Sequence, residues 1–457
     1  FCRDANAARR LCRPFQSRRG AMNPNSNVLR WLGLAALCLL LAANYFTNFA
    51  GLVEESTFRN WQQNGQARVL GGIHADRVGI DKDGTHMGKL WPVARGGTDW
   101  TGVDSSDETY RIFANPDPSE PILFEHYRQQ YGLHAAIYSA LSRHLGLQTL
   151  EALQAVTAIL TAFMVTMLFA VLLRVYNPWL AGLFLLTFAC APLFVAMARN
   201  LYWSPFLLLL PTVASAWMYL ARSRNRRLAF LGLVWIAMLL KCLSNYEYIT
   251  SVTLLACAVF LVAPMFDDPV SGRPDFRGAA VVFAACVLAF AFAFVIHASS
   301  RGDGLLDGIR TMLVEDVLRR TYGDASSFSG ETAESLLASP WDVLKIYLFD
   351  YPGKRTMLVP GKAFLAMIGL CVVGLGTRLV VGERTARRDA WAFLVFFSVP
   401  VSWFVLAKGH SYTQTHINFV LWFIGFMPAL LFVTGNTTFQ LIRLMRSRWR
   451  AGFRGTA

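Results

Sequence analysis

Charge is the property that this sequence has least of. Only 16% of its 457 residues are Asp, Glu, Lys or Arg, whereas soluble domains contain about 25%. Hydrophobic residues make up 54% of the chain and aromatic residues 13%. This balance indicates a protein that lies largely in lipid rather than in water.

Several chemical signatures are also lacking. No two of the eight cysteines have metal-ligand spacing, and neither long polar segment, 49–152 or 298–360, contains a cysteine that could brace it. No internal repeat is present, which argues against a transporter built from duplicated halves. We interpret the cysteines in apolar runs as packing residues, namely Cys38, Cys190, Cys242, Cys257, Cys286 and Cys371.

The net charge of +14 does not predict a nucleic-acid-binding surface. Arginines gather in short segments between apolar runs, and no basic face with base-stacking aromatics accompanies them. Membrane topology accounts for this pattern, because Lys and Arg accumulate in short cytoplasmic loops. We therefore expect the lipid bilayer, and no nucleic acid, as a partner.

Apolar runs near twenty residues in length recur along the chain. A hydrocarbon core of ~30 Å needs a helix of roughly that length. The runs predict an all-α polytopic membrane protein of about ten transmembrane helices, at 29–48, 153–174, 179–197, 203–221, 228–246, 250–266, 278–297, 361–380, 390–407 and 417–435.

Arginine positions predict that both termini are cytoplasmic, since the alternative orientation would place nearly every basic cluster outside. Only Arg199 and Lys408 then lie in short outside turns. Residues 1–21, which precede Met22, are either a cytoplasmic tail or an upstream extension. The first apolar run is too long for a removed signal peptide and lacks its small-residue cleavage site. We expect a tail at 1–28, a membrane part at 29–297 that includes an outside loop at 49–152, a second outside loop at 298–360, helices at 361–435 and a basic tail at 436–457.

Both outside loops contain apolar stripes at helical spacing. In the first loop the spacing predicts a helix over 123–145, with an aromatic stripe from Tyr127 to Tyr138. In the second loop one stripe lies within 306–317 and another within 337–348. Helices of this kind lie flat at a membrane surface, so we expect them to cover the outer end of the helical bundle.

Two glutamates follow the first apolar run directly. Glu54 and Glu55 lie about one turn beyond it, where a partly desolvated carboxylate can accept a proton from a sugar hydroxyl or bind a divalent cation. The alternative is a solvated helix end, where acidic residues favour the first turn.

A second acidic group contains Asp76 and Asp81. The stretch Asp81-Lys82-Asp83-Gly84 resembles the start of a calcium loop, but it lacks the acidic fifth position and the closing Glu. A polar loop is the plainer interpretation. No cofactor is predicted, and a divalent cation stays an open alternative.

Basic residues near the outer ends of the spans predict phosphate binding. Arg199 can bind a lipid-linked phosphate through two parallel N–H donors. Alternatively, its side chain can extend (snorkel) to the lipid headgroups. Lys241 lies inside a span, where inserting a charge into the membrane costs about 2.5–3.5 kcal/mol. Such a residue generally has an ion-pair partner or a functional role. It is either a structural partner of Glu247 or a phosphate-binding lysine backed by Tyr246 and Glu247.

The last outside turn, 408–418, is rich in hydrogen-bonding groups. His410 and His416 are six residues apart rather than four, so we expect no zinc site there. Together with Tyr412 they suit a pyrophosphate or a sugar. Arg319 and Arg320 of the second outside loop are expected to supplement them.

Four of these motifs, in this order, resemble the GT-C superfamily of membrane glycosyltransferases, which includes protein O-mannosyltransferases and aminoarabinose transferases. The stretch Glu54-Glu55-Ser56-Thr57-Phe58 resembles their Asp-Glu-x-x-Tyr, with Glu in place of the Asp. Ala198-Arg199 resembles their arginine-led turn, without its usual Asp. Lys241 resembles a lysine that many members place ahead of Gly-Pro, which is missing here, and Tyr412 to Asn418 resembles their Tyr-x-x-Pro region.

The resemblance implies an enzyme of a bacterial inner membrane with its active site on the periplasmic face. A polyprenyl-phosphate sugar would be the donor, and a lipid-linked, glycan or protein acceptor would be glycosylated with inversion. Glu54 or Glu55 would be the base, and Arg199 and Lys241 would hold the phosphate. Two other classes remain open, namely an O-antigen polymerase or ligase and a multi-pass transporter.

Overall fold

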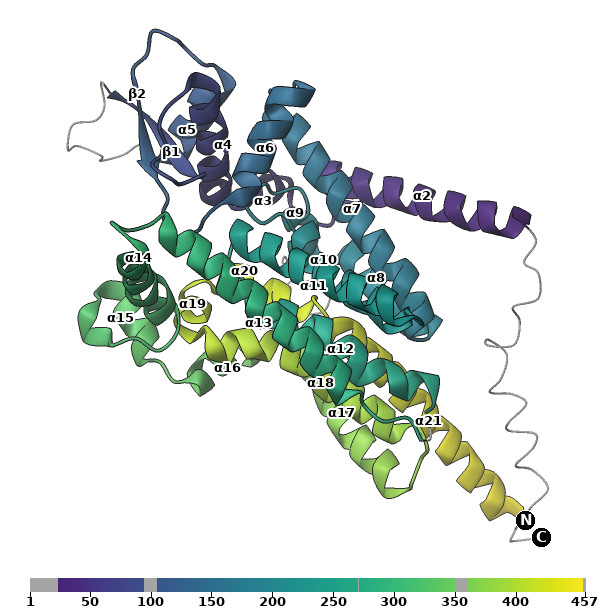
Figure 1. Ribbon diagram of the computed structural model, residues 1–457. Helices are drawn as coiled ribbons and strands as arrows, with labels where there is room; N and C mark the ends of the chain where they lie inside the picture. The colour runs from purple at the N-terminus through teal and green to yellow at the C-terminus, as the bar shows by residue number, and fades with distance from the viewer. Residues whose placement is uncertain (1–23, 94–104, 270, 350–360, 455–457) are drawn as a thin grey trace.

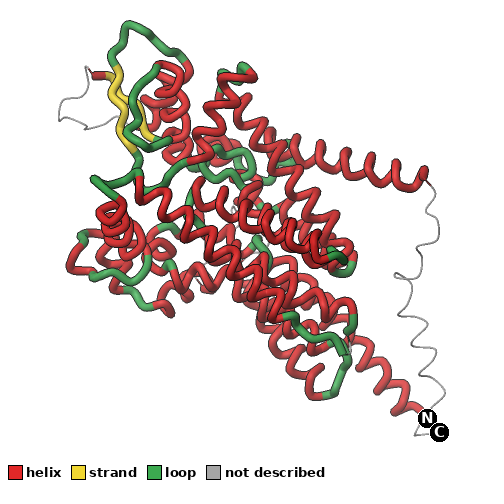
Figure 2. Tube along the Cα trace, in the orientation of Figure 1, coloured by secondary structure: helices red, strands yellow, loops and turns green. Residues whose placement is uncertain are grey.

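The computed structural model describes residues 24–93, 105–269, 271–349 and 361–454 (Figure 1). The predicted tail or extension at 1–21 lies outside the described residues. Helices form most of the described chain, and the strands found there are confined to one small region (Figure 2). Both long loops gather at one end of the helical bundle, which we call the loop end (Figure 1).

Seven described helices are long and apolar enough to cross a membrane. This confirms a helical polytopic membrane protein. The seven are α2 (Pro24–Thr47), α7 (Leu150–Val175), α11 (Arg224–Ser244), α12 (Ile249–Asp267), α13 (Phe276–Ser299), α17 (Gly361–Val380) and α18 (Ala386–Leu406).

The other three predicted spans are helical but short or bent. The run 179–197 is divided at Pro192 into α8 (Pro178–Cys190) and α9 (Pro192–Met197), because proline removes a backbone donor and ends the preceding helix. The helix α10 (Phe206–Leu220) has 15 residues. The last run consists of α20 (Thr415–Asn418), a 3₁₀ turn (Phe419–Trp422) and α21 (Phe426–Arg454), with a bend of 45°. The count of ten spans stays a prediction.

Small residues bring the central helices together. Ala285, Ala289 and Ala293 recur every fourth residue on α13 and are buried. Such a stripe lets helix backbones approach closely, which is how helices associate where no hydrophobic effect drives them. The helix α13 packs on α11 and α12, and α12 packs in turn on α10 and α18.

The first loop is a small α/β layer, so the chain is not entirely α-helical. Strand β1 (Gly88–Pro92) pairs antiparallel with β2 (Ile122–His126). On β1 pack α4 (Gln63–Val78) and α5 (Ser105–Ala114), while α6 (Leu133–Leu145) packs on α4, and α3 (Glu55–Asn60) precedes them all. Gly71 and Gly72 of α4 allow this packing, because a side chain at either would clash with a carbonyl oxygen of the 86–88 backbone.

The predicted helix over 123–145 is wrong in its first half. Residues 122–126 form β2, and the helix begins only at Leu133. Gly132 separates the two with a φ of +78°, a conformation that glycine adopts without strain. The aromatic spacing that suggested one helix therefore spans a strand, a turn and a helix.

The second loop is helical, as the stripes predict. It contains α14 (Leu305–Thr311), a π-helical turn (Met312–Leu318), a 3₁₀ turn (Ala325–Ser327), α15 (Gly330–Leu337) and α16 (Pro340–Phe349). Leu306, Leu337 and Trp341 expose apolar surface. The π turn ends directly before Arg319 and Arg320, and such turns are frequent at functional sites.

Candidate functional site

A buried carboxylate lies at the centre of the loop end. Glu247 belongs to the short turn between α11 and α12 and is 3% exposed. Its Oε1 lies 3.3 Å from Arg320 Nη1, and its Oε2 lies 3.0 Å from His410 Nε2. Gln130, in the segment after β2, donates from Nε2 to the same Oε1 at 3.3 Å. Four segments that are far apart in the sequence therefore meet at one side chain.

Hydrogen-bond partners assign the proton on His410. Asn418 Nδ2 lies 3.3 Å from His410 Nδ1, and because an amide nitrogen only donates, Nδ1 is the acceptor. The proton is then on Nε2, facing Glu247. Burial lowers the pKa of His410 below its ordinary value; Glu247 opposes this shift, and the charges of Arg320 and Arg319 add to it. His410 Nε2 therefore faces Glu247 Oε2 at ion-pair distance, although that oxygen accepts no hydrogen bond among the described residues.

Glu247 is ionised. Burial by itself would raise the pKa of its carboxyl, but His410, Arg320 and Lys241 outweigh burial and hold the pKa below the ordinary range. A carboxylate that accepts hydrogen bonds from Arg320 and Gln130 and faces His410 is a weak base and holds its neighbours firmly. Glu247 thus fixes Arg320 and His410 in place.

Two further arginines lie near Tyr127, which neighbours Arg320. Arg68 of α4 lies over the Tyr127 ring at 3.9 Å. Arg319 is half-buried, and within the described ranges its guanidinium makes no hydrogen bond or ion pair. Burial lowers the pKa of Arg319, and so does the charge of Arg320, while Tyr127 and the carboxylate of Glu315 act in the opposite direction. We call Arg68, Glu247, Arg319, Arg320 and His410 the loop-end cluster. It contains three arginines and one carboxylate.

Aromatic side chains with unused polar atoms border the loop-end cluster. Trp203 stacks on Tyr248 with ring centroids 5.2 Å apart, and Tyr248 meets the edge of Trp403 at 5.6 Å. Trp403 in turn lies 5.6 Å from the His410 ring. Among the described residues, Trp203 Nε1, Tyr248 Oη and Trp403 Nε1 are buried without a hydrogen-bond partner. Buried polar atoms are nearly always partnered in folded proteins, so this concentration favours a bound polar ligand.

Arg199 and Lys241 are held by the protein itself. Arg199 donates to the carbonyl oxygens of Phe46 at 3.3 Å and of Phe58 at 3.1 Å, and lies over the Phe58 ring. It thereby ties α3 to the end of α2. Lys241 is fully buried and donates to the backbone and side-chain oxygens of Asn245 at 2.7 and 2.5 Å. Their roles as phosphate contacts stay predictions.

Glu54 and Glu55 lie at the start of α3 on the protein surface. Glu55 forms an i,i+4 ion pair with Arg59 at 2.6 Å, and its side chain is 60% exposed. Glu54 is also exposed and accepts a hydrogen bond from Ser56 at 3.2 Å. Both carboxylates are accessible to an acceptor arriving from water. The assignment of one of them as the base stays a prediction.

The second acidic group has the contacts of a polar loop. Asp76 pairs with Lys82 at 2.6 Å, and Asp81 accepts the backbone N–H of Asp83 at 3.0 Å. No group of three or more His, Cys, Asp or Glu side chains that could hold a metal ion occurs in the described parts of the chain.

The remaining predicted residues surround the loop-end cluster without entering it. Tyr246 turns toward α13, where its hydroxyl lies 3.3 Å from His297 Nδ1. Tyr412 is partly buried against the apolar core. His416 is exposed, and its Nε2 lies 3.3 Å from Gln62 Nε2.

Sequence reasoning missed the residues that the first loop contributes. Arg68 and Gln130 are single polar residues, and no motif surrounds them. The one available signal was Arg68 itself, an arginine in the otherwise apolar stretch 67–73. No protein-family model, no curated protein and no solved structure matches this chain. Its function is therefore argued from geometry and charge.

Proposed function

We propose that this protein is an inverting membrane glycosyltransferase of a bacterial inner membrane, which transfers a sugar from a polyprenyl-phosphate donor to an acceptor on the periplasmic face. The proposal includes ten spans with both termini in the cytoplasm. One observation carries it: the loop-end cluster has three arginines for one carboxylate, and it lies where membrane helices meet the outside loops.

A lipid-linked phosphate matches this surplus charge. Arginine binds phosphate oxygens through two parallel N–H donors, and burial strengthens such a contact because water does not compete for it. Arg319 has its donors unused among the described residues, so a phosphate needs to displace no carboxylate from it. The isoprenoid tail can stay among the apolar helices while the phosphate reaches the cluster.

We propose the following transfer step. The acceptor oxygen attacks the anomeric carbon, the bond from that carbon to the phosphate oxygen breaks, and polyprenyl phosphate leaves with the bonding electron pair. The proton of the acceptor hydroxyl passes to Glu54 or Glu55. Arg319 and Arg320 stabilise the charge that grows on the leaving phosphate, and Glu247 keeps Arg320 in position before the reaction starts.

Lipid-phosphate binding tests the donor site directly. Purified protein in nanodiscs is titrated with undecaprenyl phosphate and followed by native mass spectrometry. Arg319→Gln is expected to weaken binding about tenfold, the value of one lost charge-assisted hydrogen bond. Arg310→Gln, an exposed arginine of the same loop, is the matched control and should bind like the wild type. Equal binding by the wild type and Arg319→Gln would remove the donor site.

The base assignment has its own experiment. Membrane vesicles are supplied with radiolabelled undecaprenyl-phosphate sugars, and labelled product is separated by size. Loss of transfer in Glu54→Gln or in Glu55→Gln identifies the base, while Glu331→Gln on the exposed face of α15 controls for charge. Full transfer in both single variants and in the double variant removes both glutamates from the mechanism. A product that grows by repeats contradicts single-sugar transfer and indicates a polymerase.

A further inference from the structure

The short helix α19 (Lys408–Thr413) lies directly against the backbone of Arg319 and Arg320, which we call the arginine pair. Gly409 of α19 is buried. A methyl group added at its Cα would lie 2.8 Å from the carbonyl oxygen of Arg319 and 3.2 Å from that of Arg320. Carbon and carbonyl oxygen atoms in close contact are ordinarily about 3.3–3.6 Å apart. Only glycine therefore lets the two segments lie this close.

Hydrogen bonds hold α19 near both of its ends. Lys408 Nζ donates to the carbonyl oxygens of Leu336 at 2.5 Å and Ala338 at 2.7 Å, where α15 ends. The Tyr347 hydroxyl of α16 donates to the carbonyl oxygen of Ser411 at 2.6 Å. Since α19 is tied to two other helices in this way, a side chain at its second position would displace the arginine pair.

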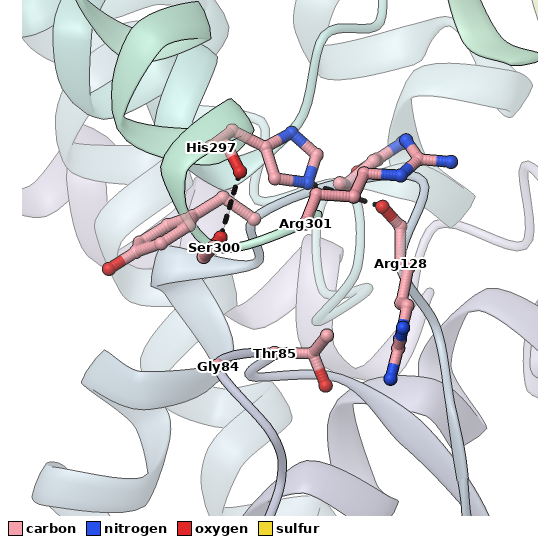
Figure 3. Close-up of a pocket in the computed structure, with 8 residues that line it drawn as sticks. Gly84, Thr85, Arg128, His297, Ser300 and Arg301 are labelled. Atoms are coloured by element: carbon pink, nitrogen blue, oxygen red, sulfur yellow. Dashed lines mark hydrogen bonds between the residues drawn. The ribbon is translucent and has the colours of Figure 1, made fainter. Parts of the chain in front are cut away.

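The segment that carries the arginine pair is tied down on either side of it. Arg301 lines the small pocket that Figure 3 shows just beyond the loop end of α13. It pairs with Asp316 and, at 2.9 Å, with Glu315, both in the π-helical turn before the arginine pair. After the pair, the Tyr322 hydroxyl donates to the Val405 carbonyl oxygen of α18 at 2.7 Å. The contact with α19 lies between these two ties, so it sets the position of the pair itself.

The two arginines depend on their backbone to different degrees. The guanidinium of Arg320 is held by Glu247 at 3.3 Å and by Gln129 Oε1 at 3.4 Å. These side-chain contacts keep it in place when the backbone shifts slightly. The guanidinium of Arg319 makes no hydrogen bond or ion pair in the described part of the chain. Its position is therefore decided by the backbone alone.

We infer that Gly409 is a positioning residue for Arg319. Its lack of a side chain lets the arginine pair lie on α19, and together with the bond from Tyr322 to Val405 this sets where the Arg319 guanidinium meets a phosphate. The inference rests on the proposed function, in which Arg319 binds the donor phosphate. Placement matters there, because two parallel N–H donors must reach two oxygens at about 2.7–2.9 Å. Gly409 acts through Arg319 and not through a contact of its own.

A double-variant cycle tests whether Gly409 acts through Arg319. The affinity for undecaprenyl phosphate is measured in nanodiscs by native mass spectrometry for the wild type, Gly409→Ala, Arg319→Gln and the double variant. We expect Gly409→Ala to lose up to about tenfold in affinity, the loss expected for Arg319→Gln. In the Arg319→Gln background the same change should cost less than about twofold, because the side chain that it displaces is gone.

Gly272→Ala is the matched control for crowding. A methyl group at Gly272 would lie 2.4 Å from the carbonyl oxygens of Asp268 and Pro264, an even closer contact than at Gly409. Gly272 follows α12 at the end of the bundle opposite the loops. Gly272→Ala should therefore bind undecaprenyl phosphate like the wild type, although it too crowds a backbone oxygen.

Three outcomes overturn the positioning role. One is wild-type affinity in folded Gly409→Ala, and another is an equal loss in the presence and absence of Arg319. The third is a similar loss in Gly272→Ala, which would indicate general damage. Thermal unfolding shows whether Gly409→Ala is folded. If it is not, Tyr322→Phe takes its place in the cycle, since this variant removes only the hydroxyl that ties the segment to Val405. Lack of coupling between Tyr322→Phe and Arg319→Gln would then overturn the inference.

The cycle separates this inference from the proposed function. If undecaprenyl phosphate does not bind to the wild type, the proposed function fails and the inference fails with it. If it binds to the wild type and is weakened in Arg319→Gln, the donor site stands. A lack of coupling between positions 409 and 319 then removes the positioning role alone.

Discussion

Two buried charge clusters lie at opposite ends of the membrane bundle, and they differ in the ratio of arginines to carboxylates. At the end opposite the loops, Arg378 pairs with Asp389 at 2.8 Å and with Glu383 at 2.7 Å, and Arg388 pairs with Asp389 at 2.7 Å. We call these four residues the opposite-end cluster. It has two arginines for two carboxylates, whereas the loop-end cluster has three arginines for one.

The hydrogen bonds of the two clusters differ in the same way. Arg378 also donates to Thr385 and Thr437, so all parts of its guanidinium are occupied within α17, α18 and α21. Arg319 makes no such bond in the described part of the chain. A neutral and fully bonded cluster holds helices together, whereas a surplus of desolvated charge is costly and favours the binding of an anion. The comparison separates a structural cluster from a binding one.

The largest expected effect comes from breaking the opposite-end cluster. Asp389→Ala should lower the free energy of unfolding by about 3–5 kcal/mol, because it leaves buried Arg378 short of a partner. Asp342→Ala removes a carboxylate from an exposed pair with Lys345 and should cost at most about 0.5 kcal/mol. Thermal unfolding in detergent measures both. Similar losses in the two variants would show that the opposite-end cluster is not structural.

A smaller effect, with rescue by ligand, is expected at Glu247. Glu247→Gln should cost about 1–3 kcal/mol, because Arg320 loses its carboxylate. Undecaprenyl phosphate supplies a replacement charge, so it should raise the unfolding temperature of Glu247→Gln more than that of the wild type. Asp389→Ala should gain no more than the wild type. Equal gains in all three proteins would contradict the division into binding and structural clusters.

Arg319→Gln should hardly change stability. The guanidinium has no hydrogen bond to lose among the described residues, so we expect a change within about 0.5 kcal/mol. Arg378→Gln, by contrast, breaks two ion pairs in a buried site and should destabilise the protein strongly. Unfolding curves of the two variants without ligand give the comparison. A large loss in Arg319→Gln would mean that this arginine is structural.

The smallest expected effect is a dependence of stability on pH through His410. Burial lowers its pKa in the folded protein, so the unfolded chain binds the proton more readily. The folded protein is therefore most stable, as far as His410 is concerned, above the ordinary histidine pKa of about 6.5. This contribution to the free energy of unfolding decreases as the pH falls below about 6.5 toward the lowered pKa of the folded state. The groups that face His410 are Glu247, Arg319, Arg320 and His416. The pKa of Glu247 is itself lowered, so its contribution is lost only in more acid solution.

Comparison with His410→Gln isolates this effect. The unfolding temperatures of the wild type and the variant are measured from neutral pH down to about pH 5.5, about one unit below the ordinary histidine pKa. We expect the difference in unfolding temperature between the wild type and the variant to shrink as the pH falls across this range. Only the wild type contains an imidazole that must stay unprotonated when it is buried. Parallel curves would show that His410 is not the group responsible.

The hydrophobic pattern of the sequence predicted the helices well. All ten apolar runs are helical in the structure, because a chain segment in lipid must satisfy its backbone hydrogen bonds internally. The prediction of a helix over 123–145 was wrong in its first half, because aromatic spacing alone does not distinguish a continuous helix from a strand and a helix joined at Gly132. The proline at 192 and the bend after Trp422 likewise altered spans that composition alone treats as continuous.

The candidate site was only partly visible in the sequence. Glu247, His410, Arg319 and Arg320 could be selected one by one, because a charged or hydrogen-bonding residue near the end of an apolar run is costly and therefore informative. Their convergence could not, since it depends on the second loop folding back onto the turn between α11 and α12. Gln130 carries no sequence signal, although it donates a hydrogen bond to Glu247.

By itself the sequence determined that this chain is a helical membrane protein with two long loops and basic connecting segments. Local properties suffice for that, because the length and polarity of each run decide whether it can lie in a bilayer. Only the tertiary structure decided which charges are neutralised and which remain in surplus. That balance depends on distances of 3–4 Å between side chains such as Glu247, Arg320 and His410, which lie tens to hundreds of residues apart in the chain.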